Sequence, residues 1–211
     1  MLERNILIVD DNPRIKSIYI PAYLDVINSL KSQSEKWNTY HFQLSHCSSM
    51  KDALDYLSNT LNIVDVLVVD YDFNGETTFT NGTSFVKYIR EKINRYCQIV
   101  FYTMQGTSNI EKSELINLIN SDVFKLVDKS LDSTEMAQIL FEAATIRNPI
   151  VESLEQFFLR YRSLLETYHY NIGGDPVSFD EMINHIRMDD SKGRLFIEKM
   201  MQKAILLNVD I

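Results

Sequence analysis

The chain has 211 residues, of which 45% are apolar and 24% charged, a composition typical of a soluble globular protein. Its 29 acidic and 21 basic side chains leave a net charge of -8, which argues against nucleic-acid binding because a nucleic-acid-binding face is basic. No apolar stretch approaches the roughly 20 residues that a membrane span needs.

The N-terminal residues and the two cysteines point to a cytoplasmic protein. Residues 1–4 lead directly into a strand-like segment, so we expect no signal peptide. Cys47 and Cys97 are the only cysteines and have no metal-site spacing. We therefore expect reduced thiols in the cytoplasm.

Strand-like and helix-like segments alternate through the first 146 residues. Strands are predicted at residues 5–9, 40–45, 64–70, 98–103 and 123–127. Helices are predicted at residues 13–30 with a kink at Pro21, from 49 onward, at 83–93, at 110–119 and, after a capping box at Asp132 and Glu135, up to 146. This alternation predicts an α/β domain, a flavodoxin-like doubly wound five-stranded parallel sheet in the order 2-1-3-4-5.

Carboxylates follow two of the predicted strands. The first strand ends in Asp10 and Asp11, and the third, a run of branched apolar residues typical of a buried strand, ends in Asp70. In the order 2-1-3-4-5 these strands are parallel neighbours, so the three acids meet at one edge of the sheet. Crowded like charges need protons or a cation, and oxygen ligands alone favour Mg2+.

Two more polar side chains reach the same edge. Thr103 ends the fourth strand and Lys129 follows the fifth. The set permits phosphoryl transfer to a carboxylate, with Asp70 as the nucleophile. Thr103 and Lys129 would stabilise charge on the phosphoryl oxygens.

These segments resemble the receiver domain of two-component response regulators. The matching stretches are Ile6–Pro13, Leu67–Asp70, Ile99–Thr103 and Val127–Lys129. The resemblance covers about residues 1–146, and each stretch falls, in order, at the end of the expected strand.

The resemblance implies a phosphorelay partner and a metal. A sensor histidine kinase or phosphotransfer protein would donate the phosphoryl group to Asp70. Beside Asp70 itself, Asp11 would be a direct Mg2+ ligand, Asp10 a ligand through water, and the backbone carbonyl of Asp72 a further ligand. The protein would hydrolyse its own aspartyl phosphate and turn over no separate substrate.

Three positions depart from the family pattern. Met104 stands where a small residue is usual and is a candidate gate over Asp70. Ser130 replaces the proline after Lys129. Leu126 replaces the aromatic switch residue three positions before Lys129.

These departures leave rival interpretations open. One is a receiver-like scaffold that works without phosphorylation, and another is a DNA-binding regulator. A third is a haloacid-dehalogenase-type phosphatase, because Asp70 and Asp72 form an Asp-x-Asp motif at a strand end. That family needs a second acidic pair at a later strand end, and Asp189–Asp190 lies between predicted helices instead.

Residues 149–211 show no strand signal, so we predict a separate all-helical interaction or dimerisation module after a receiver of residues 1–148. A helix after Pro149, a short helix capped by Ser178 and a last helix at 191–207 are expected. The first carries an apolar stripe with three- and four-residue steps: Val151, Leu154, Phe158, Tyr161, Leu165 and Tyr168. We predict that this stripe is the face for a second copy or a protein partner, and packing against the other helices of the extension is the alternative.

Overall fold

A computed structural model gives the fold. It describes residues 2–33, 35–38, 40–73, 78–103, 110–128, 130–146 and 148–207. The chain divides into two compact units, the first of residues 1–89 and 97–147, the second of residues 90–96 and 148–211. Among the described residues, no helix combines the length and the apolar character needed to cross a bilayer.

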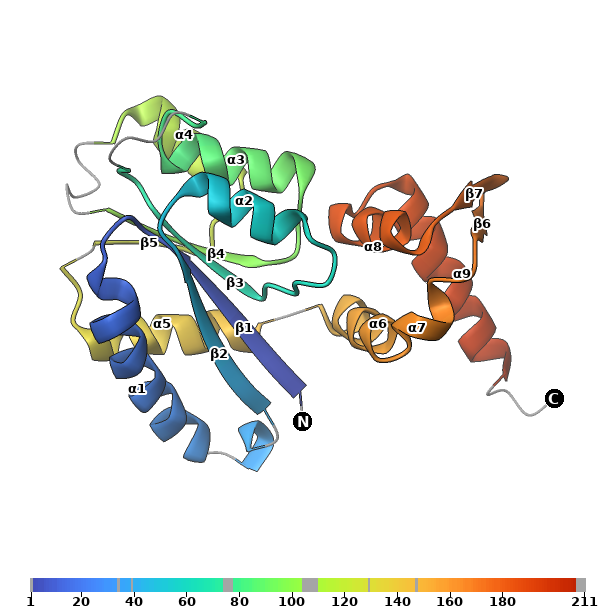
Figure 1. Ribbon diagram of the computed structural model, residues 1–211, viewed down its shortest axis with the longest axis horizontal. Coiled ribbons are helices and arrows are strands. Elements are labelled where there is room, and N and C mark those ends of the chain that lie inside the picture. Colours follow the sequence, from blue (N-terminus) through green and yellow to red (C-terminus); the bar gives the residue numbers. More distant parts are fainter. Residues whose placement is uncertain are drawn as a thin grey trace. The chain divides into compact units, whose positions relative to one another are not determined.

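A parallel sheet of five strands forms the centre of the first unit (Figure 1). The strands are β1 (Leu2–Val9), β2 (Tyr40–Cys47), β3 (Val66–Asp70), β4 (Gln98–Thr103) and β5 (Lys125–Asp128). Their order is β2-β1-β3-β4-β5, as the alternating pattern predicted. All five residues of β3 are buried, because helices cover both faces of a doubly wound sheet.

Helices cover the two faces unequally (Figure 1). They are α1 (Ile20–Ser32), α2 (Met50–Ser58), α3 (Gly82–Lys92), α4 (Lys112–Asn120) and α5 (Ser133–Thr145). Helices α1 and α5 lie on one face, while α2, α3 and α4 lie on the other. The capping box predicted at the start of α5 is present, since the Asp132 carboxylate accepts from the backbone of Thr134 and Glu135.

The helix expected at residues 13–30 is present, but its first turns are π-helical. Residues Ile15–Tyr19 form a π-helical segment, and α1 begins only at Ile20 with Pro21 in its first turn. Proline has no N–H to donate to the preceding turn and fits best at a helix start. The chain stays helical from Tyr19 into Ile20, whose N–H donates to the Ile15 carbonyl, so Pro21 follows directly after a π-helical turn within one helical segment.

The second unit has its own core. It contains α6 (Pro149–Arg160), α7 (Arg162–Leu165), β6 (Tyr170–Ile172), β7 (Asp175–Val177), α8 (Phe179–Met188) and α9 (Ser191–Leu207). Phe158 of α6, Phe179 of α8 and Phe196 of α9 are buried together, with ring centroids 5.4 Å apart for Phe158–Phe179 and 5.9 Å for Phe158–Phe196. Each such ring contributes roughly 1.5–3 kcal/mol when fully buried.

This extension is not purely helical, contrary to the sequence-based expectation. β6 and β7 pair antiparallel, joined through Gly173 and Gly174. Both glycines have positive φ angles, 64° and 102°, which a tight hairpin requires and L-residues rarely adopt. The strands are only three residues each, too short to show an alternating pattern in the sequence.

The predicted continuous stripe after Pro149 is interrupted. Helix α6 ends at Arg160, because Tyr161 leaves the helical conformation at φ -109° and ψ 20°. Val151 and Phe158 are buried in the unit's own core, whereas Tyr161 and Tyr168 are 43% and 55% exposed. Leu154 and Leu165 pack partly buried against the same core. The inner half of the stripe thus packs within the unit, and its role as an interface stays a prediction for the outer half.

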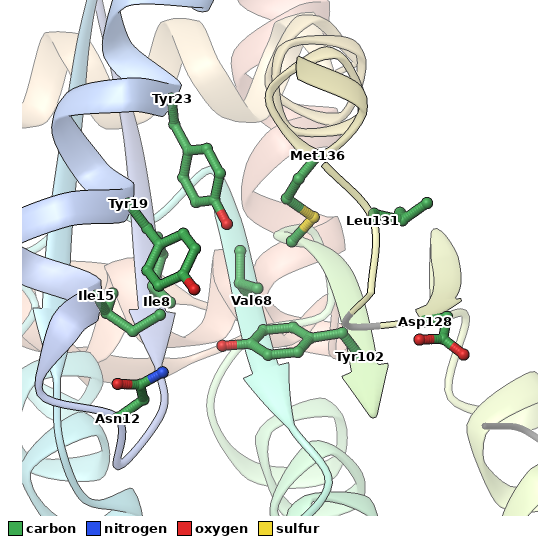
Figure 2. A pocket seen from close by; sticks show the side chains of 10 residues that line it. All are labelled: Ile8, Asn12, Ile15, Tyr19, Tyr23, Val68, Tyr102, Asp128, Leu131 and Met136. Carbon is green, nitrogen blue, oxygen red and sulfur yellow. The ribbon is translucent and has the colours of Figure 1, made fainter. Parts of the chain in front are cut away.

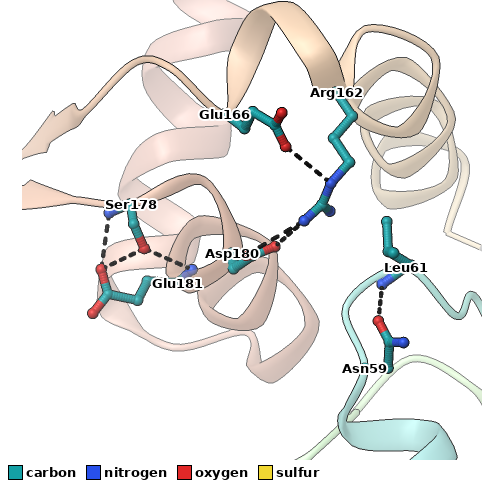
Figure 3. Close-up of polar contacts among 7 residues, drawn as sticks. All are labelled: Asn59, Leu61, Arg162, Glu166, Ser178, Asp180 and Glu181. Carbon is teal, nitrogen blue, oxygen red and sulfur yellow. Dashed lines mark hydrogen bonds and ion pairs between the residues drawn. The ribbon is translucent and has the colours of Figure 1, made fainter.

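Polar contacts stabilise the helix ends of the second unit (Figure 3). Ser178 caps α8 as predicted, and the Glu181 carboxylate accepts from the Ser178 backbone N–H at 2.8 Å in return. The Arg162 guanidinium forms two ion pairs, from Nε to Glu166 Oε2 at 3.3 Å and from Nη2 to Asp180 Oδ1 at 3.2 Å. These contacts connect α7 to α8 along the surface of the unit.

Candidate metal centre

Three carboxylates meet at the carboxyl edge of the central strands. Asp10 follows β1, Asp11 comes next, and Asp70 is the last residue of β3. One oxygen from each lies within 4.8 Å of the other two. Strands β1 and β3 are parallel with Val9 opposite Val69, which brings the three acids to the same edge.

The three acids differ in burial. Asp10 and Asp70 are 0% and 4% exposed, and Asp11 is half-buried. Removing carboxylates from water at this spacing is costly unless a cation or hydrogen-bond donors compensate their charge. An all-oxygen donor set of this kind fits a hard cation, and Mg2+ in particular.

Contacts with other residues hold both the carboxylate and the backbone of Asp10. Its Oδ1 accepts from the Asn12 backbone N–H at 2.7 Å, and its Oδ2 accepts from the Tyr102 hydroxyl. Its own backbone N–H donates to the Cys47 carbonyl at 3.1 Å, and its carbonyl oxygen lies 2.7 Å from His46 Nε2. The orientation of this carboxylate is therefore set before any ligand arrives.

Tyr102 is the site residue that the sequence did not reveal. It precedes Thr103 in β4 and faces α1 and α5, so its ring crosses β3 near Val68 to reach β1 (Figure 2). Burial, followed by the charge of Asp10 and the hydrogen bond to it, raises the pKa of Tyr102 well above its usual value. Tyr102 therefore stays a neutral donor to a buried anion.

A cavity of about 50 Å3 lies on the same face of the sheet (Figure 2). Its polar lining comes from Asn12, Tyr19, Tyr23, Tyr102 and Asp128. Burial is the main cause that raises the pKa of Tyr23 to about 12, with smaller effects from Tyr19 and Asp10. A polar cavity above roughly 10–15 Å3 can hold water, so this one has room for water beside the acid cluster. Tyr19 belongs to the π-helical segment, and such segments often occur at functional sites.

Three of the remaining predicted site residues are described and differ in burial, and two lie outside the described residues. Thr103 is fully buried at the end of β4, and Asp72 is exposed two residues after Asp70. Leu126 is half-buried in β5. Lys129 and Met104 lie outside the described residues, so their predicted roles stay predictions.

The chain after Asp70 is tied closely to the start of α3. The Gly82 N–H donates to the Tyr71 carbonyl at 2.9 Å. A Cβ on Gly82 would lie 2.0 Å from the Asp70 carbonyl oxygen, so only glycine permits this approach. Glu114 of α4 accepts from the Tyr71 hydroxyl at 2.8 Å and also from the Asn81 side chain. Backbone and side-chain contacts thus fix Tyr71, the residue directly after Asp70.

The acidic pair required by the phosphatase interpretation lies elsewhere. Asp189 and Asp190 form the turn between α8 and α9 in the second unit, not a strand end. Asp190 accepts from the Gly193 backbone N–H at 2.9 Å and lies 2.6 Å from His185 Nδ1. The pair stabilises a helix–helix turn.

No model of a known protein family matches this sequence, and no curated protein matches it. Solved structures that it resembles are receiver domains. A receiver domain protein from Methanospirillum hungatei is 13% identical, with 69% of this chain and 95% of that chain covered at a TM-score of 0.45. A receiver domain protein from Clostridium thermocellum is 14% identical, with 67% of this chain and 94% of that chain covered at a TM-score of 0.47.

The receiver domain of the response regulator NarL from Mycobacterium tuberculosis is 15% identical, covering 70% of this chain and 100% of that chain at a TM-score of 0.47. The C-terminal extension is not matched. The strand order, rather than these likenesses, carries the assignment of the first unit to the flavodoxin-like fold.

Proposed function

We propose that this chain is a response-regulator receiver protein that accepts a phosphoryl group on Asp70. The observation that carries the proposal is the cluster of Asp10, Asp11 and Asp70, in which one carboxylate oxygen from each acid lies within 4.8 Å of the other two at the carboxyl edge of the sheet. Ligand sites of open α/β sheets lie at this edge, next to the ends of the central strands. Asp70 ends the central strand β3 and is the nucleophile.

The transfer is a displacement at phosphorus. An Asp70 carboxylate oxygen attacks the phosphorus of a phosphohistidine on a sensor histidine kinase or phosphotransfer protein. A P–O bond forms, the P–N bond breaks, and the released imidazole takes up a proton. Water later cleaves the acyl phosphate, so the protein returns to its starting state without turning over a separate substrate.

Asp10, Asp11 and Asp70, with the Asp72 carbonyl, would hold Mg2+. When bound, Mg2+ neutralises charge on the phosphoryl oxygens. Asp10 is already oriented for this role by its bonds from Asn12 and Tyr102. The Thr103 hydroxyl and Lys129 would stabilise the other oxygens. A histidine-kinase donor places the reaction in the cytoplasm.

The output of this switch would be the C-terminal extension. Phosphorylation changes the charge at Asp70, and the second unit, with its exposed Tyr161 and Tyr168, would present a face to a partner or a second copy. The rival function is a scaffold that binds partners without phosphorylation. The two differ in whether the acid cluster binds Mg2+ and phosphoryl groups.

The test uses acetyl phosphate and fluoroberyllate, each with Mg2+. Intact mass spectrometry should show one added phosphoryl group on the wild-type chain and none on D70N. The matched control is D72N, because Asp72 is an exposed acid two residues away whose proposed contribution is its backbone carbonyl. Equal modification of D70N, or no binding of Mg2+ and fluoroberyllate by the wild type, would reject the proposal and favour the scaffold.

A further inference from the structure

A groove of about 390 Å3 opens on the second unit between α6–α7, β6 and α9. Its floor holds the buried side chains of Phe158, Ile172 and Phe196. Phe157 and Met200 line it as well and remain 46% and 41% exposed. A groove of this volume with an aromatic floor has the character of a binding site.

The charged side chains that line this groove have one sign. Residues 149–211 contain 10 acidic and 7 basic side chains, yet among the described residues the groove is lined by Lys199, Lys203 and the imidazole of His169, and by no carboxylate. Four of the other five basic side chains of residues 149–211 have acidic partners: Arg162–Asp180, Arg187–Glu155, Lys192–Asp175 and Arg194–Asp189. Within the described part of the chain, Lys199 and Lys203 form no ion pair, so the groove offers two uncompensated positive charges in an acidic protein.

The spacing of these charges matches a helix. Lys199 and Lys203 lie four residues apart on one face of α9, a rise of about 6 Å, which equals the spacing of acids one turn apart on a partner helix. By the same periodicity Leu207, which is 84% exposed, continues this face beyond the groove. The apolar surface is therefore longer than a small ligand would cover.

We propose that the groove binds an acidic amphipathic helix of a partner protein. Apolar anchors of that helix would cover Phe157 and Met200, and its flanking Asp or Glu side chains would face Lys199 and Lys203. This is the helix-in-groove mode of recognition. A two-fold contact with a second copy is disfavoured, because a self-complementary α9 interface would bring the two lysine pairs together.

The test measures binding of a designed helix to the full chain. The probe is a fluorescein-labelled peptide of about 18 residues, with leucines at i, i+3, i+4 and i+7 and glutamates beside them. A matched peptide carries lysine in place of each glutamate. Fluorescence anisotropy should show micromolar binding of the glutamate peptide, weakening as salt is added, and at least tenfold weaker binding of the lysine peptide.

Variants assign the binding to the groove. The double variant K199E/K203E should lose about tenfold in affinity for the glutamate peptide and gain affinity for the lysine peptide. M200E should weaken both peptides. The control is R160E, because Arg160 is an exposed base in α6 outside the groove, and its reversal should leave binding unchanged. Circular dichroism verifies that each variant is folded.

Several results would overturn the proposal. They are binding of neither peptide by the wild type, equal binding of both, and an equal response to R160E and K199E/K203E. Saturable binding of oleate that excludes the peptide would assign the groove to a small amphipathic anion instead. A wild-type dimer that M200E converts to a monomer, measured by light scattering, would assign it to a second copy.

Discussion

Replacement of Tyr102 by phenylalanine tests the least expected contact of the site. The change removes one hydroxyl and leaves the ring that packs between the sheet and helices α1 and α5. Asp10, 0% exposed, then loses the hydrogen bond that the Tyr102 hydroxyl donates to its Oδ2. We expect the metal-free protein to lose stability while its fold is retained.

The loss can be estimated from the burial of both partners. Tyr102 is 4% exposed and its hydroxyl donates to a buried carboxylate, so the lost bond should cost about 1.5–3 kcal/mol, the range for hydrogen bonds to charged groups. For a chain of this size each kcal/mol lowers the melting temperature by about 2–4 °C. Tyr102→Phe should therefore melt about 3–12 °C lower in chelator. Because Asp10 loses one of the contacts that orient its carboxylate, Mg2+ affinity should fall by about 10–100-fold.

Thermal unfolding by circular dichroism and titration calorimetry with Mg2+ measure the two effects. Tyr23→Phe is the matched control, since Tyr23 lines the same cavity and its hydroxyl forms no hydrogen bond with the described residues. It should change both quantities less. The reasoning is refuted if Tyr102→Phe melts at the wild-type temperature, or if both tyrosine variants lower Mg2+ affinity equally. Calorimetry of the wild type separately establishes whether the metal site exists.

Three further changes probe the acid cluster and the second unit. Asp11→Ala should raise the metal-free melting temperature, because it relieves repulsion among crowded carboxylates, and should reduce the stabilisation that Mg2+ gives; a lower metal-free melting temperature would contradict the crowding. Gly82→Ala should lower both the melting temperature and the rate of acetyl-phosphate labelling, because a Cβ 2.0 Å from the Asp70 carbonyl oxygen must displace backbone. Mass spectrometry measures the labelling rate. An unchanged rate would show that the backbone adapts away from Asp70. Arg187→Met should destabilise the second unit by about 3–5 kcal/mol in urea unfolding. The change removes the buried ion pair between Arg187 Nε and Glu155 Oε1, which are 2.8 Å apart, while Glu155 stays 4% exposed. The double variant with Glu155→Met should recover most of that loss, and a double variant as unstable as the single one would assign the effect to packing.

The sequence by itself determined the first unit well, because its signals are local. A run of apolar residues ending at Asp70 marks a buried strand, and alternating strands and helices leave few topologies for the chain to adopt. The adjacency of Asp10, Asp11 and Asp70 then follows from the strand order, without knowledge of any side-chain contact. The caps at Asp132 and Ser178 are equally local, since each joins residues two or three positions apart.

Tertiary structure decided what depends on contacts between distant residues. Tyr102 donates to Asp10 across the intervening strand, 92 residues away in sequence, so no spacing rule predicts the bond. The stripe after Pro149 had the period of one long helix, but the chain turns at Tyr161 and a hairpin follows it. Nothing in the sequence singles out Lys199 and Lys203, and only the packing of α6–α7 and β6 beside α9 brings them to an aromatic groove. Periodicity states which face of an element is apolar, and only packing determines which other element meets that face.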